Sequence, residues 1–249
     1  EAKVQLTELL SQVSTVYLLP GEDRKSVDLV EVCVNDLRGQ HRQGKSIPTH
    51  YIDAETLLHE MRLVKDHHEV QVMRRAAILS ADAHKKMMAE TKPDLSESEL
   101  EAGLIYSFMK AGARFPAYSP IVAGGENACV LHYTQNDQRL KAGELVLIDA
   151  GGEYQHYAAD ITRTYPYRKG LFAELIDEMD KLQLAMVAEL KPGLRYTDVH
   201  LKAHRQLAKV LVDFEFVTCS ASAAVETGIT RYFFPHGLGH HLGLQIGWK

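Results

Sequence analysis

The sequence predicts an α+β fold in which helices flank an antiparallel sheet. Two patterns support this class. Apolar residues recur at intervals of three and four in four segments, near positions 66–92, 96–108, 171–190 and 197–211. Between the second and third of these segments the period changes to two, at 145–149 and 157–165. Helices that occur in pairs on either side of such strands are typical of an antiparallel α+β domain.

The predicted helices have local start and stop signals. Asp66 is followed three residues later by Glu69, and Ser96 by Glu99, which is the spacing of a capping box. The third helix is expected to end before Pro192 and Gly193. The helix that starts at Asp66 carries one stripe at helical spacing, formed by Val70, Met73, Ala77, Ala81 and His84.

Residues 1–60 are predicted to be the end of a small α/β domain, and residues 61–249 a larger second domain. An amphipathic helix is expected over 4–13, followed by an apolar strand at 16–19 and a turn at Pro20 and Gly21. The stretch 38–49 is polar and shows no regular pattern.

Charge and composition argue against several classes of protein. The chain of 249 residues has a formal net charge of −5 and no basic stripe that could neutralise phosphates, so nucleic acid is not an expected partner. Cys33, Cys129 and Cys219 lie far apart without a CxxC spacing, which argues against a disulfide framework and a zinc knuckle. No apolar run approaches the roughly 18 residues of a membrane span. We therefore expect a cytoplasmic protein.

Two aspartates lie at corresponding places in the predicted hairpin. If its turn is centred near Tyr154 and Gln155, then Asp149 and Asp160 are directly opposite each other, with Cβ atoms roughly 4.5–5.5 Å apart. Their apolar neighbours would desolvate both carboxylates, which then need protons or cations between them. A pair of divalent metal ions roughly 3.5–4 Å apart would meet this need. The alternative is that both aspartates are solvated turn residues that never meet.

Histidines form a second candidate site. His236 and His240 are separated by Gly237 and Gly239, and two glycines make an ordinary helix face unfavourable by roughly 1 kcal/mol each. A strand or bend could instead turn both ring nitrogens into one cavity. The alternative is a glycine-rich turn with surface histidines. His132, in an apolar setting, is by itself more typical of a core residue than of a catalyst.

Together these segments resemble the proline-specific branch of the pita-bread metallopeptidases, which includes Xaa-Pro aminopeptidase and Xaa-Pro dipeptidase (prolidase). The resemblance covers roughly 56–246, with several motifs in family order and spacing. The segments 58–68 and 114–134 look more like the aminopeptidase, and 172–246 looks more like the bacterial dipeptidase. The matching strings are Val-Leu-His-Tyr-Thr at 130–134, Leu-Ile-Asp-Ala-Gly at 147–151, Tyr-Ala-Ala-Asp-Ile-Thr-Arg-Thr at 157–164, and Phe-Phe-Pro-His-Gly-Leu-Gly-His-His-Leu-Gly at 233–243.

The resemblance implies a pita-bread (creatinase/aminopeptidase) fold that is incomplete at the C-terminus, preceded by a remnant of a creatinase-like N-terminal domain. It implies a metal-dependent exopeptidase that releases the N-terminal residue of Xaa-Pro peptides and forms a homodimer or homotetramer. Xaa-Pro dipeptidase is an alternative activity, and a non-catalytic binding protein on the same fold is another. Creatinase-like chemistry is disfavoured because those enzymes do not keep the metal ligands.

By position, the family's metal ligands fall on Asp149, which would bridge two divalent metal ions, and on Asp160 and His240. Mainly carboxylate ligands suit manganese, and zinc or cobalt would also be compatible.

The resemblance also implies roles for three further residues. His132 matches a catalytic histidine that helps to place the substrate near the scissile bond, and His236 matches a histidine that lines the substrate pocket. Tyr118 matches a tyrosine that steadies a ligating carboxylate.

The chain departs from the family pattern near its end. Gly247 replaces a histidine that stabilises the tetrahedral intermediate, and two glutamate ligands have no counterpart. Losing one oxyanion-type donor typically costs roughly 10²–10³ in rate. We therefore expect the chain as given to be inactive.

Overall fold

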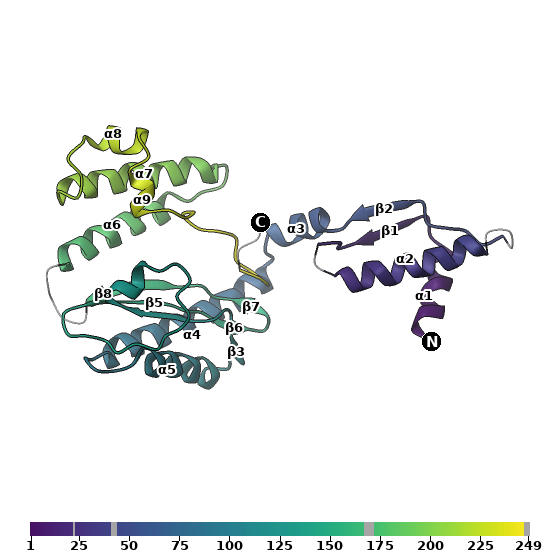
Figure 1. Cartoon of the computed structure of the whole chain (residues 1–249), viewed down its shortest axis with the longest axis horizontal. Coiled ribbons are helices and arrows are strands. Elements are labelled where there is room, and N and C mark those ends of the chain that lie inside the picture. The colour runs from purple at the N-terminus through teal and green to yellow at the C-terminus, as the bar shows by residue number, and fades with distance from the viewer. Residues whose placement is uncertain (22, 41–43, 167–171, 247–249) are drawn as a thin grey trace. The chain divides into compact units, whose positions relative to one another are not determined.

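The computed structural model describes residues 1–21, 23–40, 44–166 and 172–246 (Figure 1). The chain divides into two compact units, Glu1–Asp66 and His67–Lys249, which we call unit 1 and unit 2. The boundary expected between residues 60 and 61 is close to this division. That unit 1 is the remnant of a larger domain stays a prediction. Gly247, the predicted departure from the family pattern, lies outside the described residues.

Unit 1 contains three helices and two strands among its described residues. They are α1 (Ala2–Leu10), β1 (Thr15–Leu18), α2 (Arg24–Gly39), β2 (His50–Asp53) and α3 (Glu55–Leu63). The strands pair in parallel, and α2 provides the crossover that a parallel pair requires. Its small core consists of Leu10, Val30, Cys33, Val34 and Leu37.

Helix α2 was missed by the sequence analysis, although signals for it are present. Val27, Val30, Val34 and Leu37 recur at intervals of three and four and are all buried. The side chain of Asp23 accepts a hydrogen bond from the backbone N–H of Ser26 and so caps the helix. Strand β2, by contrast, exposes all four of its residues, so it lacks the alternation that would have revealed it.

The four helices predicted in unit 2 are confirmed. They are α4 (His67–Glu90), α5 (Glu97–Lys110), α6 (Ala173–Glu189) and α7 (Tyr196–Asp213), and the short helices η2 (Gly125–Cys129), α8 (Ala221–Glu226) and α9 (Thr230–Phe233) accompany them. The predicted capping box of α5 is present, because Ser96 and Glu99 each accept a hydrogen bond from the backbone of the other.

The buried face of α4 differs from the predicted stripe. Of the predicted positions only His84 is buried, while Val70 is 41% exposed. The buried residues are Val72, Ala76, Leu79, Ser80, Ala83, His84 and Met87. Both sets have helical spacing, and the alanines in each fit either environment, so local periodicity could not choose between them.

The strands of unit 2 form two small antiparallel sheets. One has the order β4-β5-β8, from β4 (Ile121–Gly124), β5 (Leu145–Asp149) and β8 (Thr162–Pro166). The other has the order β3-β6-β7, from β3 (Phe115–Pro116), β6 (Gly152–Tyr154) and β7 (Tyr157–Ala158). The single strand expected over 157–165 is therefore divided into β7 and β8. With helices around antiparallel sheets, the α+β class is confirmed.

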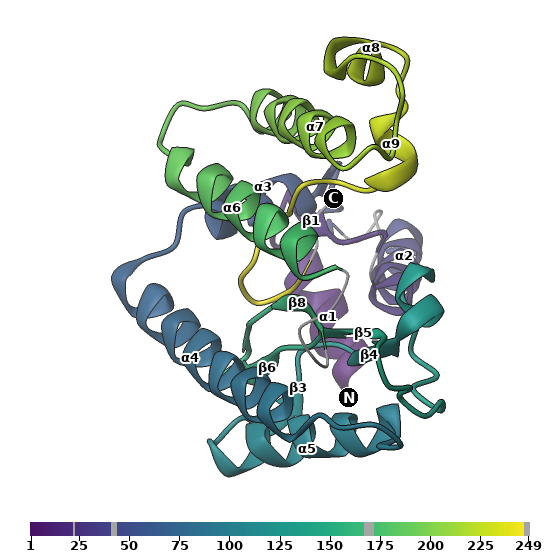
Figure 2. The ribbon, with the colours of Figure 1, turned by 90° about the vertical axis from the view of Figure 1, so that its left-hand side faces the viewer.

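Helices α4 and α5 pack along one side of these sheets, and α6 and α7 lie on the other side (Figures 1 and 2). The main core of unit 2 joins α4 and α5 to β4 and β5, and its fully buried members include Leu104, Phe108, Val122 and Ile148. This packing anchors β5, which ends at Asp149, against α4 and α5. No helix among the described residues is long and apolar enough to cross a membrane.

Candidate metal centre

The predicted pairing of Asp149 with Asp160 is wrong in register. Asp149 lies opposite Thr162, and Tyr154 lies opposite Tyr157. The turn consists of Gln155 and His156, both with positive φ, and so lies one residue further along than expected. The partner of Asp149 therefore shifts by two residues. Because side chains alternate with a period of two, this shift leaves Asp160 on the face that the predicted register assigned to it.

Asp149 and Asp160 still meet, and they meet at Tyr118. The hydroxyl of Tyr118 donates to Oδ1 of Asp149 and lies 3.0 Å from Oδ1 of Asp160. Tyr118 lies between β3 and β4, where the N–H of Ala117 donates to the carbonyl of Gly151 at 2.8 Å. One phenolic hydrogen thus serves two carboxylates, which places the three side chains around one point.

Burial raises the pKa of two of these three side chains, Tyr118 and Asp149. It raises the pKa of Tyr118, and the negative charges of Asp149 and Asp160 raise it further, so the phenol keeps its proton. Burial also raises the pKa of Asp149 above its usual value; the hydrogen bond from Tyr118 lowers this pKa, and the charge of Asp160 raises it. The two carboxylates therefore form an acidic pair that a nearby cation would stabilise.

His240 reaches the same pair from the other end of unit 2. Its Nε2 lies 3.1 Å from Oδ2 of Asp160, and its Nδ1 lies 2.9 Å from the carbonyl oxygen of His241. A carbonyl only accepts, so Nδ1 carries the ring proton. In the neutral ring, Nε2 then presents a lone pair to a carboxylate oxygen. Such a contact is favourable only when a proton or a metal cation lies between the two atoms.

Carboxylate oxygens and imidazole nitrogens are atoms that commonly bind metal ions in proteins. Ligand bonds of 2.0–2.2 Å at a tetrahedral centre would put a histidine nitrogen and a carboxylate oxygen about 3.3 Å apart, close to the spacing of His240 and Asp160. The arrangement is nevertheless incomplete. Within the described ranges, no group of three or more His, Cys, Asp or Glu side chains is placed to hold a metal ion. Asp149, Asp160 and His240 thus stand as two adjoining pairs that share Asp160.

His132 and His236 lie outside these contacts. His132 is exposed and has a positive φ of 55°, on a loop whose next residue, Tyr133, is buried and donates to Glu97 at 2.8 Å. The ring of His236 meets that of Phe234 edge-on, with centroids 4.8 Å apart. His236 and His240 thus have different neighbours, and the shared cavity predicted for them stays a prediction.

Two positioning residues escaped the sequence analysis. Nε2 of His84 donates to the carbonyl of Ala150 at 2.8 Å, directly after Asp149. A histidine in an otherwise apolar stripe was the signal for it. The hydroxyl of Tyr196 donates to the carbonyl of Gly239 at 2.7 Å and accepts from the N–H of the same residue at 3.0 Å, which fixes the backbone beside His240. Nothing in the local sequence indicates this long-range contact.

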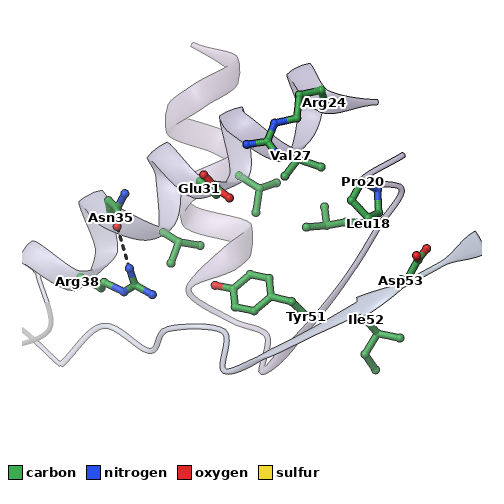
Figure 3. A pocket seen from close by; sticks show the side chains of 12 residues that line it. Leu18, Pro20, Arg24, Val27, Glu31, Asn35, Arg38, Tyr51, Ile52 and Asp53 are labelled. Carbon is green, nitrogen blue, oxygen red and sulfur yellow. Dashed lines mark hydrogen bonds between the residues drawn. The ribbon is translucent and has the colours of Figure 1, made fainter. Parts of the chain in front are cut away.

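A pocket of about 600 Å³ lies in unit 1, and its lining includes none of the predicted site residues (Figure 3). It opens between α2 and strands β1 and β2. Val27, Val30 and Tyr51 contribute apolar wall, and Arg38, which donates to Asn35 at 2.9 Å, lies at its rim. Since none of the predicted ligands lines it, this pocket is not part of the candidate metal centre.

The chain is similar to known metallopeptidases. The model of metallopeptidase family M24 matches residues 71–247. The chain is 36% identical over 250 residues to the Xaa-Pro aminopeptidase of Escherichia coli (strain K12), a match that covers 99% of this chain and 56% of that protein. It is 42% identical over 194 residues to the Xaa-Pro dipeptidase of Shewanella loihica, covering 76% of this chain and 43% of that protein.

Among solved structures, zinc-substituted Escherichia coli aminopeptidase P in complex with product is similar with a TM-score of 0.94 at 36% identity. That match covers 98% of this chain and 56% of the solved chain. The chain thus spans about half the length of the relatives that it matches.

Proposed function

This chain belongs to metallopeptidase family M24, and on that premise we propose that the whole protein is an Xaa-Pro aminopeptidase. The observation that carries the proposal is the extent of the match. Similarity to the Escherichia coli Xaa-Pro aminopeptidase runs through 99% of the chain, whereas similarity to the Shewanella loihica dipeptidase covers 76%. The substrate would be a peptide with proline in the second position.

Asp149, Asp160 and His240 would hold the metal. A divalent ion at such a centre supplies Lewis acidity, which makes water a better nucleophile at neutral pH and polarises a peptide carbonyl. A mainly carboxylate set suits Mn²⁺, and the zinc-substituted relative indicates that this architecture also accepts Zn²⁺.

The remaining residues of the candidate site would position these ligands and the substrate. Tyr118 holds both carboxylates through one hydroxyl, so it fixes their separation before a cation arrives. His132, on its exposed loop, would contact the peptide near the scissile bond, and His236 would line the substrate pocket. Both assignments rest on the family motif.

For residues 1–249 taken alone we propose weak metal binding and no turnover. Two carboxylates and one imidazole support part of a centre, and in the described ranges they do not form a group of three. Without more ligands neither the metal nor the substrate would be held in the orientation that hydrolysis needs.

Two assays test this proposal. The product of the complete gene, supplied with Mn²⁺, is given an Xaa-Pro-Xaa tripeptide and the matching Xaa-Pro dipeptide, and release of the first residue is measured. Preferential cleavage of the tripeptide is expected. Cleavage of the dipeptide alone would assign the dipeptidase activity instead, and cleavage of neither would overturn the proposal. Turnover by purified residues 1–249 would contradict the expected inactivity of this polypeptide.

A further inference from the structure

Two histidines of α7 face each other outside the candidate metal centre. His200 and His204 are four residues apart, so they lie on one face of the helix. Their Nε2 atoms are 3.2 Å apart, and the rings are nearly perpendicular, with an interplanar angle of 85° and centroids 4.6 Å apart. The imidazoles thus turn their outer nitrogens toward one point.

The hydrogen bonds of this pair are not complete. Nδ1 of His204 lies 2.9 Å from the hydroxyl of Thr230, and both of these residues are buried. Nδ1 of His200 is buried without a hydrogen-bond partner among the described residues. Two neutral rings carry one proton each, and whichever ring donates across the Nε2 contact, this Nδ1 stays unpaired. A contact between the two histidines alone therefore leaves them unsatisfied.

The spacing suits a shared cation. Metal–nitrogen bonds of 2.0–2.1 Å at a tetrahedral centre would separate two imidazole nitrogens by about 3.3 Å. Helical zinc sites take two of their ligands from histidines at positions i and i+4, which is the spacing of His200 and His204. Thr230 supports such a role, because a hydrogen bond at Nδ1 fixes the orientation of the ring and leaves Nε2 to bind.

The surroundings of the pair favour a neutral His204 and pack against both rings. Burial lowers the pKa of His204, and the neighbouring His200 and Arg231 lower it further, so this ring is neutral at neutral pH. In the tautomer whose Nδ1 donates to Thr230, Nε2 carries the lone pair. Tyr196 stacks on His200, and Phe234 packs against both rings, with centroids 5.5 Å from His200 and 5.0 Å from His204. His200 is only partly buried, which leaves a route for an ion to enter.

We propose that His200 and His204 chelate one divalent transition-metal ion through their two Nε2 atoms, with water completing its coordination. An imidazole-only pair favours Cu²⁺, Ni²⁺ or Zn²⁺ over Mn²⁺, so this site and the carboxylate centre select different ions. The positive charge of Arg231 nearby works against a cation and sets a moderate affinity. The proposal does not depend on peptidase activity, and either can fail without the other.

The test uses residues 1–249 in which Asp149→Asn and Asp160→Asn disable the carboxylate centre. One equivalent of Cu²⁺ is added, its coordination is followed by electron paramagnetic resonance, and Ni²⁺ affinity is measured by calorimetry. Hyperfine coupling to two imidazole nitrogens is expected. Adding His200→Gln should remove the coupling to one nitrogen and lower the affinity for Ni²⁺ by about tenfold or more. The matched control is His156→Gln, at an exposed histidine of the β6–β7 turn, which should change neither signal.

Each result of this experiment either supports or overturns the proposed site. The two-nitrogen signal and its loss in His200→Gln would support the site. The proposal would be overturned if the starting variant gave no copper signal from two nitrogens. It would also be overturned if His200→Gln left the copper spectrum and the Ni²⁺ affinity unchanged. His200 is partly buried, so its substitution is expected to leave the fold intact, and circular dichroism of each variant checks this.

Discussion

Gly151 lies against the carbonyl of Ala159 so closely that a Cβ on residue 151 would come 1.8 Å from that oxygen. The contact occurs where β5 bends into β6 and where the returning chain passes from β7 to β8. Asp149, at the end of β5, and Asp160, between β7 and β8, flank this crossing. The close approach of two backbones is therefore part of what brings the carboxylates together.

Gly151→Ala is expected to destabilise unit 2 strongly. The obstructing atom belongs to the backbone and cannot move aside, so the strands must separate, at a cost of at least about 1–3 kcal/mol. Urea unfolding measures the change. Gly239→Ala is the matched control, because a Cβ there meets nothing within 4 Å and φ is not positive. Equal stability of the two variants would contradict the account of the crossing.

Tyr118→Phe is expected to destabilise the metal-free chain, more at neutral than at acidic pH. The variant keeps the ring but removes the hydrogen that two carboxylates share, at a cost of about 1–3 kcal/mol. The pKa of Asp149 is already raised in the folded state, so its charged form disfavours folding and protonation relieves this. Denaturation in EDTA at several pH values measures both effects, and a loss that does not shrink toward low pH would contradict this role. Tyr106→Phe, at an exposed tyrosine of α5, should have little effect.

His84 should make the folded state sensitive to mild acid. Burial lowers its pKa, so the unfolded chain binds a proton more readily than the folded chain. Stability is complete above the unfolded pKa of about 6.5 and falls as the pH drops through that value toward the lower folded pKa. His84→Gln, whose amide can still donate to Ala150, should remove this part of the pH dependence. Melting temperatures of both proteins between pH 8 and 5 test it, and parallel curves would contradict it.

Glu97→Gln is expected to loosen the loops that carry His132. This buried carboxylate accepts four hydrogen bonds, two at each oxygen, from Gly124, Asn127, Tyr133 and Gln138. In the glutamine variant the NH₂ group would replace one carboxylate oxygen and face two hydrogen-bond donors. The free energy of unfolding should then fall by about 1.5–3 kcal/mol. Urea unfolding measures the loss. Glu90→Gln, at an exposed end of α4, should cost almost nothing, and similar losses in both would argue against the network.

Mn²⁺ should stabilise the chain through the candidate metal centre. At a hundredfold excess over its dissociation constant, a bound ion adds about 2.7 kcal/mol. Manganese is the suitable probe because the imidazole pair of α7 does not favour it. His240→Gln should abolish the rise in melting temperature, whereas His236→Gln should keep it, since His236 lies outside the contacts of the carboxylate pair. A rise that survives in His240→Gln would remove this histidine from the proposed ligands.

The sequence alone determined what depends on neighbours along the chain. Ser96 and Glu99 cap a helix because both partners lie within one turn, and β5 ends at Asp149 where its apolar run ends. The family motifs also pointed to Tyr118, Asp149, Asp160 and His240. These side chains are linked by contacts in the structure, and their role in metal binding stays a proposal.

Only the tertiary structure decided the buried face of α4, the register of the hairpin and the partners of the histidines. The turn at Gln155 and His156 uses two positive φ angles without a glycine, so the usual sequence signal of such a turn is missing. His84 reaches Ala150, and Tyr196 reaches Gly239, across long separations in the chain. Contacts of this kind depend on how whole elements pack, and local periodicity carries no information about that packing.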